Sequence, residues 1–144
     1  MPMIDVFAAA KTFKNKPELV KALTSALMRW EQVPPISLFI DNTAAFIHEL
    51  PAEALGTAGG ESNYVRVQVL TPAGTLSREN KLGVTKEMTD IIAAAAGDPS
   101  LVQRTWVLIT EAPDGGWGID GHAYTSAEIG DAARRELAAA AGKK

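Results

Sequence analysis

The chain has 144 residues, a net charge of −3 at pH 7 and a hydrophobic content of 47%. These values are typical of one globular domain with a buried core. The sequence lacks a cluster of lysine and arginine, which makes nucleic acid an improbable partner, and it lacks cysteine, which excludes disulfides and thiolate chemistry. It also lacks a signal-peptide pattern and an apolar run of membrane-spanning length, so we expect a cytoplasmic protein with no membrane partner.

The first half of the chain is predicted to form a strand, a helix and a second strand. Residues 3–8 alternate as a strand does, and Asn15 and Pro17 mark a helix start, as a cap and an early-turn residue. One stripe of this helix is apolar and contains Leu19, Leu23, Ala26, Leu27 and Trp30. The sequence Val33-Pro34-Pro35 ends the helix, and residues 43–50 form the second strand.

The second half repeats this order. Residues 64–70 alternate as a strand, with valines on one side and polar residues on the other. Ser77 is a plausible cap for a helix over residues 78–96, which Gly97 ends. Residues 104–112 form the second strand of this unit. A glycine-rich turn or hairpin follows at Pro113-Asp114-Gly115-Gly116-Trp117-Gly118-Ile119-Asp120-Gly121.

The repeated order predicts an α/β fold built from two tandem β-α-β units. We expect the units at residues 1–61 and 62–124 to pair edge to edge into a four-stranded sheet with both helices on one face. The other face would be apolar and uncovered, which favours oligomerisation. Residues 125–144 are predicted to form a C-terminal helix with no counterpart in the first half, because Thr125 and Glu128 have capping-box spacing.

Two features of the sequence resemble the 4-oxalocrotonate tautomerase branch of the tautomerase superfamily. One is Met1-Pro2 directly before a β-α-β unit, and the other is Ile109-Thr110-Glu111 followed by Trp117-Gly118-Ile119-Asp120-Gly121. Small family members end their single unit in Ile-Thr-Glu, then an aromatic residue and Gly-Ile-Gly-Gly. Here Asp120 replaces a glycine, and the first copy has Leu55 at the aromatic position. The resemblance covers residues 2–121 as two fused copies.

The resemblance implies a cofactor-free isomerase. Small members assemble six single units as a hexamer, so a chain with two fused units is expected to assemble as a homotrimer. Only the first copy can present an N-terminal proline, Pro2, once Met1 is removed. A terminal amine titrates at about 7.7–8.0, and burial or a neighbouring cation lowers that value, so the Pro2 amine suits a general base near neutral pH. The ordinary alternative is that Pro2 only begins a strand, where proline is tolerated.

Three functions follow from the resemblance. The first is a tautomerase in which Pro2 is the base and the substrate is a 2-oxo or unsaturated organic acid. The second is a hydratase or dehalogenase of an unsaturated acid in which Pro2 is cationic and acts as the acid. The third is a non-catalytic trimeric binding protein, which the missing family arginines and the extra C-terminal helix favour.

Family tautomerases bind their acid substrates through arginines, and this chain has none at the matching positions. Lys11 and Lys14 are the candidates for the first cation, in the loop after the first strand. Arg104 and Arg66 are the candidates for the second. Lysine lacks the bidentate fork of arginine, so the binding geometry would differ. Each of these four residues is otherwise explained as a solvated surface charge.

Four further residues are candidates for the site. Family position makes Trp117 a wall that keeps the proline dry, and Asn42 a hydrogen-bond partner for the substrate. Asp41 lies where some dehalogenase relatives place a water-activating carboxylate. His48 lies within a strand, where a structural role is favoured over catalysis. The two histidines of the chain, His48 and His122, lack metal-site spacing, so no metal is expected.

Overall fold

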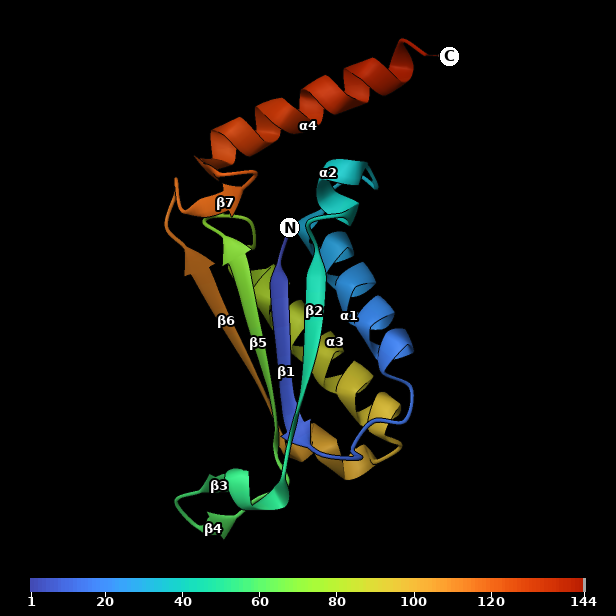
Figure 1. Cartoon of the computed structure of the whole chain (residues 1–144), viewed down its shortest axis with the longest axis vertical. Helices are drawn as coiled ribbons and strands as arrows, with labels where there is room; N and C mark the ends of the chain where they lie inside the picture. The colour runs from blue at the N-terminus through green and yellow to red at the C-terminus, as the bar shows by residue number, and fades with distance from the viewer. Residues whose placement is uncertain (144) are drawn as a thin grey trace.

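The structure is a computed structural model that describes residues 1–143. One four-stranded sheet carries two long helices on one face, and a third long helix lies across one end (Figure 1). The sheet consists of β1 (Met3–Ala9), β2 (Ala44–Leu50), β5 (Val65–Pro72) and β6 (Thr105–Ala112). The long helices are α1 (Lys16–Glu31), α3 (Arg78–Ala96) and α4 (Ser126–Ala141). The short elements are α2 (Ser37–Ile40), η1 (Ala52–Ala54), β3 (Gly56–Thr57), β4 (Gly60–Glu61), η2 (Pro99–Gln103), β7 (Trp117–Ile119) and β8 (His122–Tyr124).

The strand order confirms the predicted fold class. The order is β2-β1-β5-β6, with β1 parallel to β2 and β5 parallel to β6. Each parallel pair with its crossover helix is one β-α-β unit. The antiparallel pairing of β1 with β5 joins the two units, and it places Val6 opposite Val67 at its centre.

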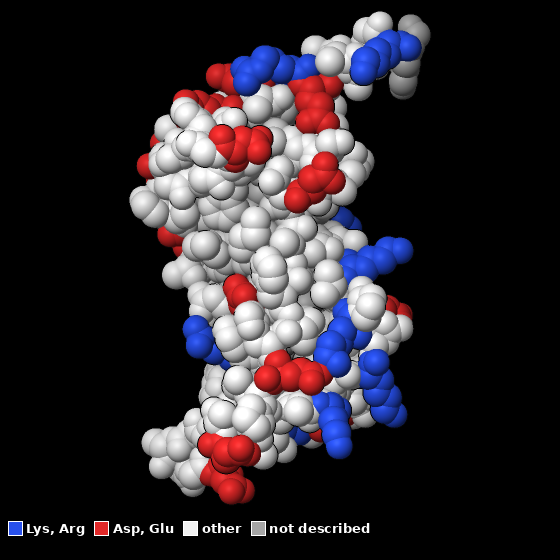
Figure 2. Space-filling view, viewed as in Figure 1, with Lys and Arg blue, Asp and Glu red and all other residues white. Residues whose placement is uncertain are grey.

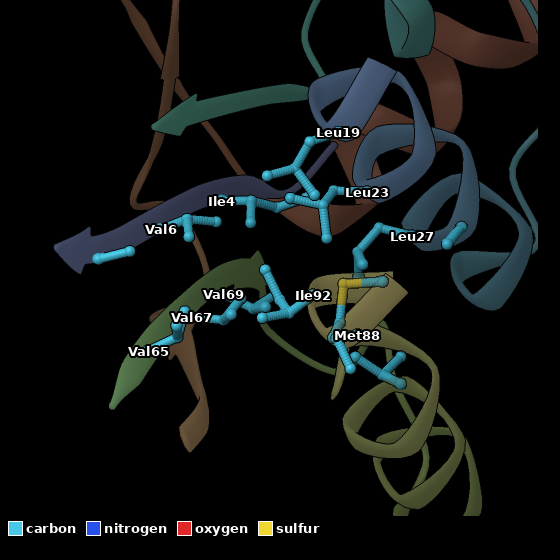
Figure 3. Close-up of a cluster of buried hydrophobic side chains, with 14 of the residues drawn as sticks. Ile4, Val6, Leu19, Leu23, Leu27, Val65, Val67, Val69, Met88 and Ile92 are labelled. Carbon is cyan, nitrogen blue, oxygen red and sulfur yellow. The ribbon is translucent and has the colours of Figure 1, made fainter. Parts of the chain in front are cut away.

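The core lies between the sheet and the two crossover helices. Alternate residues of the central strands point into it, and Ile4, Val6, Val67 and Val69 are fully buried. Figure 3 shows these side chains beside those of the helices: Leu19, Leu23 and Leu27 from α1, and Met88 and Ile92 from α3. The predicted apolar stripe of α1 is therefore its buried face, although Trp30 at its end is only partly buried.

The helix boundaries follow the predicted caps. The side chain of Asn15 accepts a hydrogen bond from the backbone of Glu18, and that of Ser77 accepts one from Asn80. Gly97 ends α3 with a φ of +63°, a conformation that glycine adopts without strain. Both hydrogen bonds of the predicted capping box are present at the start of α4.

Two segments refine the prediction. Residues 36–43, which the second unit lacks, contain the short helix α2 before β2 begins. The glycine-rich segment forms the β7–β8 hairpin, whose two-residue turn is Asp120-Gly121 with φ values of +52° and +77°. Both turn residues need positive φ in this hairpin type, and Asp-Gly suits it. Asp120 in place of the family's glycine is therefore compatible with the turn.

The sheet face opposite the helices is uncovered. Four large apolar side chains lie on it with more than a third of their surface exposed, namely Phe46, Leu70, Trp106 and Leu108. Figure 2 shows this face as a mostly uncharged surface, with charged side chains gathered toward its edges and ends. A monomer rarely exposes so many large apolar groups on one face.

Helix α4 lies across the end of the sheet where β1 begins and β5 ends (Figure 1). Its first half contributes the buried residues Ile129 and Ala133. The carboxylate of Glu136 accepts hydrogen bonds from the backbone N–H groups of Ser37 and Leu38, which attaches α4 to α2. None of the helices in residues 1–143 has both the length and the apolar character needed to cross a membrane.

Candidate functional site

Pro2 is buried at the start of β1, at the end of the sheet that α2 and α4 cover. Its carbonyl oxygen accepts a 3.2 Å hydrogen bond from the backbone N–H of Ala44, the first residue of β2. In the described chain the Pro2 nitrogen is bonded to Met1 as an amide and cannot act as a base. The pocket that holds Met1 therefore determines the environment that a free Pro2 amine would have.

Met1 is enclosed, with only 2% of its surface exposed. Its ammonium group donates a hydrogen bond to Oε2 of Glu31 over 2.5 Å, and the two groups form a buried ion pair. The hydroxyl of Thr71 donates to the other carboxylate oxygen, Oε1 of Glu31, over 2.6 Å. Helix α1 supplies Glu31 from its last residue, and β5 supplies Thr71.

Burial dominates the electrostatics of the N-terminal amine. Loss of hydration lowers the pKa of the Met1 ammonium below its ordinary value of 8.0, and the charge and hydrogen bond of Glu31 partly oppose this effect. The neutral form of an amine is therefore more populated at neutral pH here than on the protein surface. A general base needs this form.

Apolar side chains surround the Met1 side chain. Phe39, Trp117, Ile129 and Ala133 form a second buried cluster with it, separate from the main core. Beside Met1 lies a cavity of about 170 Å³. Its lining residues are Met1, Glu31, Val33, Phe39, Pro72, Thr75, Ser126, Ile129 and Gly130. The pocket is thus mostly apolar, and its polar groups are the N-terminal amine, the Glu31 carboxylate and the hydroxyls of Thr75 and Ser126.

The β7–β8 hairpin and α4 hold the outer wall of this pocket in place. At the turn before β7, a Cβ on Gly116 would lie 2.9 Å from the carbonyl oxygen of Pro113, so only glycine fits. The backbone N–H of Ser126 donates to Asp114 Oδ1 over 2.7 Å, and this ties the start of α4 to the same turn. Trp117, with 5% of its surface exposed, belongs to the same buried cluster as Met1, and its role as a wall of the site stays a prediction.

Asp41 and Asn42 lie at the same end of the molecule as Pro2, in a neighbouring cavity of about 220 Å³. Ile129 lines both cavities, so the two are adjacent. The amide of Asn42 donates a 2.8 Å hydrogen bond to the carbonyl oxygen of Leu38. Within one chain, this hydrogen bond links the Asn42 side chain to the backbone of α2.

The structure does not bring the predicted cations to Pro2 within one chain. Lys11 is exposed and follows the last residue of β1, whereas Pro2 precedes the first, so about 20 Å of strand separates them. Arg66 lies on the uncovered sheet face opposite Phe7, with its guanidinium 5.3 Å from the centre of the Phe7 ring.

Arg104 and Lys14 also lie toward the end of the sheet opposite Pro2. Arg104 follows η2, where its guanidinium donates to Asp98 over 2.8 Å and to Ser100 over 2.8 Å. Lys14 lies at the rim of a separate groove between α1 and α3, which Ile91 and Ala95 also line.

His48 has a structural environment on the uncovered sheet face. Its Nε2 lies 2.6 Å from Oδ1 of Asp5, and its ring stacks on Phe7 with centroids 4.3 Å apart. Within residues 1–143 no group of three or more histidine and acidic side chains could hold a metal ion.

Sequence reasoning missed the polar partners of the N-terminus. Glu31 lies four residues after Leu27 and so continues the apolar stripe of α1, where a charged residue is unexpected. A charged residue at an apolar position of the helix was the signal in the sequence that could have identified Glu31. Thr71 likewise continues the buried alternation of β5, and Phe39 belongs to the α2 segment that the second unit lacks.

Comparison with solved structures identifies the fold. The structure of a native fused 4-OT superposes with a TM-score of 0.72 and 24% identity over 89% of this chain and 98% of that one. The asymmetric trimer of F6 fused 4-OT gives a TM-score of 0.73 and 22% identity, with the same coverage. The chain has the fused 4-OT fold.

A member of a dehalogenase family has the same fold. N1, a member of the cis-3-chloroacrylic acid dehalogenase family, superposes on the fused 4-OT fold of this chain with a TM-score of 0.72 and 18% identity. The match covers 88% of this chain and 87% of N1. No protein-family model and no curated protein matches the sequence. Identities this low establish the fold alone.

Proposed function

We propose that this protein is a cofactor-independent tautomerase whose general base is the amine of Pro2, set free by removal of Met1. One observation carries the proposal: the N-terminus ends inside a buried pocket next to a cavity, and burial there lowers the pKa of a terminal amine. Loss of Met1 would join its volume to the cavity and leave the secondary amine facing the space.

The proposed reaction is keto–enol tautomerisation. The neutral Pro2 amine takes a proton from the enol oxygen, or from the carbon beside a carbonyl group, and becomes a cation. It then returns the proton to the other atom of the substrate, so the product is an isomer and the enzyme ends unchanged. Trp117 and Ile129 are buried beside the N-terminus and limit its contact with bulk solvent, which favours the neutral amine before each cycle.

We propose a 2-oxo or unsaturated organic acid as the substrate and a homotrimer as the working assembly. The asymmetric F6 and symmetric Q0 fused 4-OT trimers share the fold. The uncovered apolar sheet face of this chain is a surface suited to self-association. Since Lys11, Arg66 and Arg104 lie far from Pro2 of their own chain, they would serve an acid substrate only at the site of a neighbouring subunit.

A hydratase or dehalogenase of an unsaturated acid is the second candidate. The ion pair at the N-terminus favours it, because a carboxylate beside the amine supports the cationic form that acts as an acid. Asp41 would activate the water in this reaction. Its activity would fall as the amine loses its proton, whereas tautomerase activity would rise.

The Pro2→Ala variant tests the proposed function. Alanine also allows removal of Met1, and it leaves a primary amine with a different basicity and shape at the same place. We expect the ketonisation of phenylenolpyruvate or 2-hydroxymuconate to fall by at least about 100-fold, the usual contribution of a general base.

The matched control is Pro51→Ala, which replaces an exposed proline at the start of η1. It should retain the parent activity. Full activity in the Pro2→Ala variant, or a purified chain that keeps Met1, would contradict the proposal and favour a non-catalytic trimeric binding protein.

A further inference from the structure

Glu31 is a buried carboxylate that the proposed reaction does not yet use. Its side chain has no exposed surface, and it ends the apolar stripe of α1. Burying an ionised carboxylate is costly unless it is paired and hydrogen-bonded. Here both oxygens are occupied, one by the N-terminal ammonium and the other by the Thr71 hydroxyl.

Within residues 1–143, the residues lining the pocket carry no charge besides Glu31 and the N-terminal amine. The elements that face the Glu31 carboxylate are the N-terminus, the end of β5 with the loop after it, α2 and α4, and their lining residues are apolar or neutral. Among the described residues, the N-terminal amine is the one cation in contact with Glu31. Within the described residues the Glu31 carboxylate and the N-terminal amine therefore form an isolated ion pair.

Removal of Met1 moves the N-terminus by a short distance. Three backbone bonds of about 1.3–1.5 Å link the Met1 nitrogen to the Pro2 nitrogen, so the two atoms are about 3 Å apart. Because Oε2 of Glu31 lies 2.5 Å from the Met1 nitrogen, it lies within about 6 Å of the Pro2 nitrogen. A side-chain rotation into the vacated space, or one bridging water molecule, closes this gap.

We propose that Glu31 is the partner of the Pro2 amine in the processed enzyme: its carboxylate, oriented by Thr71, accepts the hydrogen bond of the amine and stabilises the positive charge that the amine gains during proton transfer. This inference rests on the proposed function and adds a positioning residue to it. The resemblance that suggested Pro2 did not indicate this glutamate.

The Glu31 carboxylate would let a buried amine remain an effective base. Burial alone weakens the affinity of the amine for a proton. A fixed carboxylate in a site of low dielectric offsets that effect when the amine becomes charged. Glu31 gains and loses no atoms in the cycle, since the proton passes from substrate to Pro2 and back to substrate.

The test is an NMR titration of the processed chain with ¹³C-labelled proline and glutamate, with loss of Met1 checked by mass spectrometry. Signals that disappear in the Pro2→Ala variant belong to Pro2. In Glu31→Gln the pKa of the Pro2 amine should fall by about one to three pH units, because an anionic neighbour is lost. The matched control is Glu87→Gln, which removes a partly buried glutamate on α3 and should leave the Pro2 titration unchanged.

A second measurement needs no variant. In the parent chain the side-chain carboxyl signal of Glu31 should shift at the pH where Pro2 titrates, because the two groups are coupled. The inference would be overturned if the Pro2 titration is unchanged in folded Glu31→Gln. It would also be overturned if the chemical shift of the Glu31 carboxyl stays constant over the pH range in which Pro2 titrates. Neither result depends on activity. The role of Glu31 can therefore fail while Pro2→Ala still abolishes turnover, and the role of Pro2 can fail while the coupling to Glu31 is observed.

Discussion

Met1 fills space that the proposed enzyme needs, so its removal should weaken the fold. The perturbation is the loss of this single residue, compared between two preparations of one chain. One preparation is the processed form. The other keeps Met1 because the methionine aminopeptidase of the expression host is inhibited. Both have identical sequences from Pro2 onward, so any difference between them arises at the pocket.

The size of the effect follows from the burial of Met1. Its side chain is 2% exposed and packs on Phe39, Trp117, Ile129 and Ala133. Truncation of a buried methionine costs about 2–5 kcal/mol through lost transfer free energy and the cavity left behind. We expect a value near 3 kcal/mol, because the existing cavity beside Met1 lets part of the new space become hydrated. If the Pro2 amine did not replace the Met1 amine at Glu31, the unpaired carboxylate would add about 3–5 kcal/mol.

Urea unfolding at equal protein concentration measures this difference, and equal concentration matters because assembly contributes to stability. With a typical slope of about 2 kcal/mol per molar urea, the midpoint should fall by about 1.5 M. A small carbonyl compound that binds the vacated space should restore part of the loss in the processed form and none in the form with Met1. Equal midpoints for the two forms would refute the reasoning, since Met1 would then occupy no pocket that a substrate could use.

Two further predictions concern the assembly and the response to acid. Leu108→Glu places a charge on the uncovered sheet face and should weaken self-association by at least about 100-fold in sedimentation experiments, because burying an unpaired charge costs several kcal/mol. Leu82→Glu, at an exposed leucine of α3, should associate like the parent, and equal association of both variants would place the interface elsewhere. The hydrogen bond from Arg29, with one from Trp30, holds the pKa of Glu87 below its ordinary 4.5. The stabilisation of the fold by ionised Glu87 is therefore present above pH 4.5 and lost as the pH falls through the lower pKa of the folded state. Unfolding titrations should show a smaller acid-induced loss of stability for Glu87→Gln than for the parent. Parallel curves of stability against pH would contradict this assignment.

Local signals in the sequence were sufficient to predict the fold. Asn15, Ser77 and Thr125 are side-chain caps, and each acts within three residues, so its effect depends little on the rest of the chain. The repeated order of strand, helix and strand then indicates two β-α-β units that share one sheet. The Asp120-Gly121 turn was predictable for the same reason, because turn type depends on two adjacent residues.

The surroundings of the N-terminus depend on contacts between distant segments, and they were not predicted. Glu31 and Thr71 are 40 residues apart and meet only because α1 ends beside the end of β5. The position of α4 over this end likewise depends on Glu136, which binds α2 across 99 residues of sequence. The separation of Lys11 from Pro2 follows from the fold, since they lie beyond opposite ends of β1.

The most direct test of the central claim compares the activity of the two preparations that differ only in Met1. In the form with Met1, the Pro2 nitrogen is an amide that cannot accept a proton, and the Met1 side chain fills the pocket. We predict that the processed form ketonises phenylenolpyruvate or 2-hydroxymuconate and that the form with Met1 does not. Equal activity of the two forms would show that the reaction, if it occurs, does not use the Pro2 amine.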